Sequence, residues 1–131
     1  MASELKVDKF TGVTTAGSIL VTGEGNSTTT NLQQGLAKAW GVLDGTGTVG
    51  LNDSFNCASI ADNGTGDYTV TYTNAFGSAN HSSTMTVGDG SIGARCNGGR
   101  TTTTVNYQCL STSFGTQDDD DLSLTCHGDL A

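Results

Sequence analysis

The sequence predicts a mainly β protein: a small antiparallel β-sandwich or jelly-roll-like domain, preceded by an extended N-terminal arm and one short helix. Three observations predict this class. Gly, Thr, Ser and Asn dominate the 131 residues, and Thr favours strands whereas Gly and Asn favour turns. Residues 68–73 and 102–110 alternate in the manner of half-buried strands. Proline is absent, so tight turns must come from Gly, Asn and Asp, which tolerate positive φ.

Residues 1–37 are predicted to form an arm that serves attachment and trimerisation. Residues 5–10 alternate as a short strand, and residues 19–21 form a second short apolar run. Neither run has enough apolar partners for a core, and short hairpins are marginal in isolation. We therefore expect the arm to dock on its own domain, on sister chains or on another protein. The expected interface residues are Leu5, Val7, Ile19, Val21, Leu32 and Leu36.

The best helix candidate spans residues 31–40. Thr30 followed by Gln33 matches a capping box, and apolar residues recur at helical spacing on one face. Gly35 weakens the helix by about 1 kcal/mol relative to Ala, and a helix this short needs a buried face. That face would pack under a sheet of the same chain or form a three-fold bundle in a trimer. Its members are Leu32, Leu36 and either Ala39 or Trp40.

Residues 38–131 are expected to form the sandwich, because short alternating segments follow one another with turn signals between them. Residues 44–47 and 63–66 read as hairpin turns, since neither is followed by the Lys and helix of a phosphate loop. Residues 88–99 read as a loop. The expected strands are 39–43, 49–51 extending to 55, 68–73, 83–87, 102–110 and 122–127.

The net charge of −8 argues against several classes of partner. Only five cationic side chains are present, so neither nucleic acid nor an anionic membrane surface is an expected partner. No apolar run approaches transmembrane length, so membrane insertion is not expected. Residues 1–25 lack the basic region and apolar core of a secretory signal.

Asp118, Asp119, Asp120 and Asp121 form the most conspicuous charge run and are the one candidate for a metal site. Clustered carboxylates suit Ca²⁺, which takes six to eight oxygen ligands. Adjacent residues of an extended chain point in opposite directions, however, so four in a row cannot all chelate one ion. A solvated acidic turn between strands 102–110 and 122–127 is the favoured interpretation. No metal and no cofactor are expected.

The four cysteines are Cys57, Cys96, Cys109 and Cys126, and none has the CxxC spacing of a zinc site. Cys109 and Cys126 lie on the two expected strands that flank the acidic turn. A disulfide between them is the favoured pairing, which leaves Cys57 to pair with Cys96. Four reduced, buried thiols are an equal alternative for a cytosolic product.

Trp40, Tyr68, Tyr72 and Phe55 are predicted to be core residues, whereas Phe114 lies in a polar stretch. An exposed aromatic ring could instead stack on a sugar. Glycoside hydrolysis would need a positioned pair of carboxylates in a cleft. Both glutamates lie in the arm, no catalytic residue is assigned, and the protein is not expected to be an enzyme.

Two blocks of the sequence resemble fibre-type structural proteins of bacteriophage virions. The first runs from Leu5-Lys6-Val7-Asp8 through residues 12–19 (GVTTAGSI) to residues 31–38 (NLQQGLAK). The second comprises Ala39-Trp40 with residues 44–49 (DGTGTV), 53–56 (DSFN) and 62–70 (DNGTGDYTV). The resemblance implies a β-rich, commonly trimeric protein of tail or fibre architecture, without shared catalytic residues.

We therefore expect a virion structural protein, a tail or short-fibre component that acts by assembly. It would be made in the cytoplasm of the bacterial host, form a homotrimer, and contact other virion proteins through its arm. A host surface glycan is a further candidate partner. The alternatives are a capsid-decorating protein, of the head-fibre or cement kind, and a small glycan-binding adhesin module.

Overall fold

The computed structural model describes residues 4–13, 15, 17–23, 28–88 and 93–131. The chain divides into two compact units, Met1–Gly35 and Leu36–Ala131. In the first unit, β1 (Leu20–Thr22) pairs antiparallel with β2 (Thr29–Asn31), and one turn of helix, α1 (Leu32–Gly35), follows. None of the described residues of this unit is buried.

The helix is much shorter than the predicted span of residues 31–40. The Asn31 side chain caps it, because Oδ1 accepts hydrogen bonds from the backbone N–H groups of Gln33 (2.8 Å) and Gln34 (3.2 Å). Asn31, rather than Thr30, is therefore the N-cap residue. The helix ends at Gly35, the weak point of the predicted span. Trp40 belongs to a strand instead, since cross-strand pairing outcompetes a short helix without a buried face.

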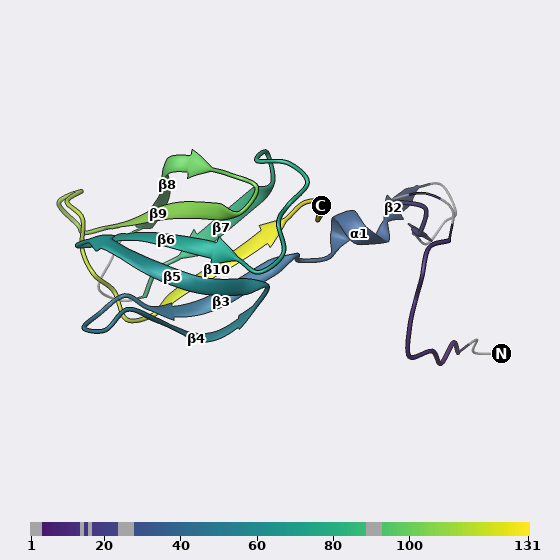
Figure 1. The fold of residues 1–131 in the computed structure, drawn as a ribbon, viewed down its shortest axis with the longest axis horizontal. Helices are drawn as coiled ribbons and strands as arrows, with labels where there is room; N and C mark the ends of the chain where they lie inside the picture. Colours follow the sequence, from purple (N-terminus) through teal and green to yellow (C-terminus); the bar gives the residue numbers. More distant parts are fainter. Residues whose placement is uncertain (1–3, 14, 16, 24–27, 89–92) are drawn as a thin grey trace. The chain divides into compact units, whose positions relative to one another are not determined.

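The second unit is a sandwich of two four-stranded antiparallel sheets, and Figure 1 shows the sheets as two layers. We call them the β3 sheet and the β6 sheet. The β3 sheet has the order β4 (Gly50–Phe55), β3 (Ala39–Asp44), β10 (Leu122–His127), β7 (Ser82–Thr86). The β6 sheet has the order β5 (Cys57–Gly64), β6 (Asp67–Tyr72), β9 (Thr104–Leu110), β8 (Gly93–Arg100).

The core lies between the two sheets and follows the alternation of the sequence. Both central strands of each sheet bury every second residue, as the patterns of β6 and β9 predict. Each fully buried aliphatic or aromatic side chain contributes about 1.5–3 kcal/mol through removal from water. The buried apolar residues are Ala39, Leu43, Tyr68, Val70, Tyr72, Phe76, Val105, Tyr107, Cys109, Leu122, Leu124 and Cys126.

The strand predictions hold for the strands that contribute to this core, within one or two residues at each end. Both predicted hairpin turns are confirmed: β3 pairs with β4 across residues 45–49, and β5 pairs with β6 across residues 65–66. Three assignments are wrong. Residues 5–10 are not a strand, β5 was not expected, and β8 replaces the second part of the predicted loop 88–99, of which residues 89–92 lie outside the described residues. Both missed strands lie at the edges of the β6 sheet and present mostly exposed, polar residues.

Candidate functional site

The acidic segment ties three turns together at one end of the sandwich. Asp118 Oδ1 accepts hydrogen bonds from the backbone N–H of Gly66 (2.6 Å) and from the Tyr68 hydroxyl (2.9 Å). The Asp119 carbonyl accepts from the backbone N–H of Gly45 at 2.9 Å. Asp119 Oδ1 accepts from the backbone N–H of Gly88 (3.2 Å). The turns that follow β3, β5 and β7 are therefore all held by this segment.

The prediction of a solvated acidic turn is wrong for Asp119, which is only 3% exposed. A turn residue is buried here because its carboxylate and its carbonyl both meet backbone donors. Asp118, Asp120 and Asp121 are exposed, as a solvated turn predicts. Within the described parts of the chain, no group of three or more His, Cys, Asp or Glu side chains is placed to hold a metal ion. The segment acts as a structural tie.

A polar cluster on the outer face of the β6 sheet was not predicted. Asp67 Oδ1 accepts from the side-chain amides of Asn63 (3.2 Å) and Asn106 (2.8 Å), and Oδ2 accepts from those of Asn97 (3.1 Å) and Gln108 (2.8 Å). One carboxylate thus connects all four strands. Because each oxygen already accepts two hydrogen bonds, we interpret the cluster as a tie across the sheet rather than as an open ligand site.

These contacts also set the acidity of the carboxyl group. Burial raises the pKa of Asp67, but the hydrogen bonds from Asn106, Gln108, Asn63 and Asn97 outweigh it and leave the pKa below its usual value. The outward alternation of polar residues along β6 and β9 is the sequence signal that could have revealed this face.

Three rings and one thiol form a buried cluster that includes core residues. The His81 ring stacks on Phe76, with ring centroids 4.1 Å apart and planes 14° apart. His81 Nδ1 lies 3.1 Å from the Ser78 carbonyl and Nε2 lies 2.9 Å from the Tyr72 hydroxyl. A neutral ring that donates from Nδ1 and accepts from the tyrosine at Nε2 satisfies both contacts. The Tyr72 hydroxyl also lies 3.4 Å from Cys126 Sγ.

This environment predicts that stability falls in mild acid. His81 is 4% exposed, and burial lowers its pKa below 6.5, helped by the charge of Arg100 and opposed by the Ser78 contact. His81 therefore binds a proton more weakly in the folded state than in the unfolded state. Its contribution to the free energy of unfolding is complete above pH 6.5 and decreases as the pH falls below 6.5. Urea unfolding at pH 7.5, 6.5 and 5.5 measures this slope. The slope should shrink in His81→Gln, and an unchanged slope would contradict the assignment.

The four cysteines are free thiols, so the predicted disulfides are not formed. Cys109 on β9 and Cys126 on β10 are both buried, on strands of different sheets, and remain separate thiols. The second pairing fails on distance. Cys57 and Cys96 lie on opposite edge strands of the β6 sheet, about 14 Å apart at about 4.8 Å per strand, and a disulfide needs Cα atoms within about 7 Å.

The thiols of Cys57, Cys109 and Cys126 have low reactivity at neutral pH. Burial raises the pKa of Cys57 to about 11 and that of Cys109 to about 11, and it also raises that of Cys126. The reactive thiolate is therefore scarce at neutral pH. Cys96 is exposed on β8.

The aromatic residues divide differently from the prediction. Tyr68 and Tyr72 are buried as expected, but Trp40 is 37% exposed and Phe55 is 51% exposed. Both occupy outward positions, directly opposite each other on β3 and β4. Phe114 is 77% exposed, in accordance with its polar surroundings. Its backbone has a φ of 62°, a left-handed conformation that is rare for a bulky residue.

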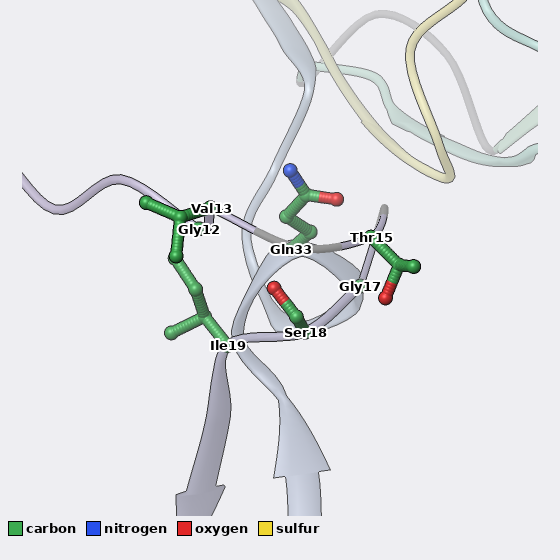
Figure 2. Close-up of a pocket in the computed structure, with 7 residues that line it drawn as sticks. All are labelled: Gly12, Val13, Thr15, Gly17, Ser18, Ile19 and Gln33. Carbon is green, nitrogen blue, oxygen red and sulfur yellow. The ribbon is translucent and has the colours of Figure 1, made fainter.

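The arm exposes most of its apolar side chains. Of the predicted interface residues, Leu5, Val7, Val21 and Leu36 are exposed, whereas Ile19 and Leu32 are half-buried. The arm contains a hollow with a volume of about 280 Å³. Figure 2 shows the residues that line it: Gly12, Val13, Thr15, Gly17, Ser18, Ile19 and Gln33. The apolar side chains of Val13 and Ile19 lie on one side of it. A unit this open has too few internal contacts to bury its own apolar surface.

Comparison with known proteins gives no match: no family model, no curated protein and no solved structure is similar to this chain. The described part of the chain contains no helix that is long and apolar enough to cross a membrane. The function must therefore be argued from the fold and from its exposed surfaces.

Proposed function

We propose that this protein is a structural component of a bacteriophage virion, a tail or short-fibre protein that acts by assembly. The observation that carries the proposal is the arm. Its described residues before β2 include six exposed large apolar side chains, and none of the described residues of the arm is buried. Exposed apolar side chains in such number favour a protein interface. These six side chains are Leu5, Val7, Phe10, Val13, Leu20 and Val21.

The sandwich unit supports the same role. Hydrogen-bonded ties at Asp67 and at the acidic segment hold its strands and turns together. The resemblance of residues 5–38 and 39–70 to phage fibre-type proteins points in the same direction. In this role the arm attaches and trimerises the protein, and the sandwich faces outward in the virion.

Two alternatives use the same architecture. A capsid-decorating protein would attach through the same arm to a different part of the particle. A glycan-binding module is favoured by one observation, Phe114 on the loop between β9 and β10. Its ring is exposed and its backbone has a strained left-handed conformation, and such backbone strain often persists at binding sites. Of the three roles, assembly as a tail or short-fibre component ranks first.

Assembly predicts a mass in solution well above that of one chain. We expect sedimentation equilibrium of the full-length chain to give about three times 13.3 kDa at micromolar concentration. The apolar arm drives this association, so the double variant Leu5→Ser, Val21→Ser should shift the population toward monomer. Phe114→Ser, which removes an exposed apolar ring from the sandwich, is the control. A stable wild-type monomer whose arm amides are protected from hydrogen exchange would contradict the proposal.

A further inference from the structure

An apolar patch on the outer face of the β3 sheet has no role within its own sheet. Trp40 and Phe55 are register partners on β3 and β4, and the next outward pair along the strands is Val42 and Asp53. The Trp40 ring points away from the core, since its neighbours Ala39 and Gly41 are buried, and Phe55, its register partner, lies on the same face. Two exposed aromatic rings in direct cross-strand opposition form a continuous apolar surface, unlike a single exposed side chain.

The patch extends onto the last strand of its sheet. The sheet order is β4-β3-β10-β7, so among the described residues one edge of β4 faces no further strand of that sheet. No proline occupies this edge, and Asp53 is the one charged residue of β4. An open edge next to an apolar patch suits an extended segment that adds as a strand and covers the rings with its side chains.

We propose that this edge and patch bind residues 5–9 of the arm of a second copy of this chain. The inference rests on the proposed assembly role, which requires copies of the chain to bind one another. Residues 4–13 belong to no helix or strand, and Leu5 and Val7 are both exposed. In an extended conformation, Leu5, Val7 and Lys9 share one face.

The two sequences match when they run antiparallel. Val7 opposite Phe55 places Lys9 opposite Asp53, because each pair is separated by two residues. The match sets an apolar side chain against the aromatic patch and a cation against an exposed carboxylate. The wider charge distribution agrees with it. Residues 36–131 carry ten of the thirteen acidic residues but only three of the five cationic ones, and Lys6 and Lys9 supply the other two.

The test uses Trp40, the only tryptophan of the chain, as a reporter located in the patch. As full-length protein is concentrated, we expect Trp40 emission to shift to the blue and acrylamide quenching to weaken, in step with the mass from sedimentation. Phe55→Thr and Val7→Ser should each weaken association about 10- to 100-fold, as expected for loss of a buried apolar side chain. Phe114→Ser removes a more exposed ring elsewhere and should change neither readout.

An exchange of the two charges distinguishes the loss of this contact from a loss of association that has another cause. Lys9→Asp should weaken association, and adding Asp53→Lys to the same chain should restore it. Full association in Phe55→Thr and Val7→Ser would overturn this inference while leaving assembly intact. Shielding of Trp40 that does not depend on concentration would also overturn it, because the arm would then cover its own chain. A wild-type monomer at all concentrations would refute both the inference and the proposed function.

Discussion

Replacing Gly66 with Ala should destabilise the sandwich by about 3 kcal/mol or more. Gly66 has a φ of 64°, and a Cβ atom there would lie 2.5 Å from the Gln117 carbonyl oxygen and 2.6 Å from the Gln117 backbone nitrogen. Backbone atoms cannot move aside as a flexible side chain can. The substitution would therefore push the acidic segment away from the turn and stretch the hydrogen bond from the Gly66 N–H to Asp118.

Gly47→Ala is the matched control for this prediction. Gly47 has a similar φ of 57°, but no atom lies within 4 Å of the position of its Cβ. This variant should be destabilised only by the left-handed backbone conformation of alanine, by about 1 kcal/mol. Urea unfolding of both variants, with an unchanged m-value, measures the difference. Equal losses would show that the acidic segment does not pack on the Gly66 turn.

Replacing Asn56 with Ala should cost about 3 kcal/mol, by a different mechanism. Asn56 lies between β4 and β5, where the chain leaves one sheet and enters the other, and its φ is 58°. Its Nδ2 donates to the carbonyls of Lys38 (3.0 Å) and Asn74 (3.2 Å), and its Oδ1 accepts from the Asn74 backbone N–H (2.7 Å). Alanine loses these hydrogen bonds and tolerates the left-handed conformation poorly.

Two further variants separate the contribution of the hydrogen bonds from that of the left-handed backbone conformation. Asn56→Gly loses the hydrogen bonds but accepts the backbone conformation, so it should be more stable than Asn56→Ala by about 1 kcal/mol. Asn56→Asp keeps the acceptor oxygen but turns a carboxylate oxygen toward two carbonyls, so it should be destabilised at neutral pH. Thermal unfolding ranks all three, and a loss of 3 kcal/mol corresponds to a decrease in Tm of about 12–24 °C for a domain of this size. A wild-type Tm in Asn56→Ala would show that this corner is held by other contacts.

The sequence was a good guide where burial follows a short-range pattern. The alternation of residues 68–73 and 102–110 located β6 and β9 and assigned their inward faces correctly, because every second side chain of such a strand enters the core. The Gly-rich turns were equally clear, because positive φ favours glycine. The edge strands β5 and β8 were missed because backbone pairing holds them while their side chains remain mostly exposed and polar.

The candidate site was less predictable, because it depends on which strands become neighbours. Cys109 and Cys126 were expected on the two strands that flank the acidic turn, and only the structure shows that these strands, β9 and β10, lie in different sheets. Trp40 has the size and apolarity of a core residue, but the register of β3 places it on the outward face. A shift of one residue would have buried it, and nothing local in the sequence fixes that register.

The sequence by itself determined the fold class, the central strands, the turns and the separation of an apolar arm from a β domain. These properties follow from alternation, composition and backbone preference, which act between residues close in the chain. Only the tertiary structure decided that Asp119 is buried, that Asp67 connects four strands and that Trp40 and Phe55 form an exposed pair. Each of these depends on contacts between residues far apart in sequence, and the order and register of the strands in the two sheets establish those contacts.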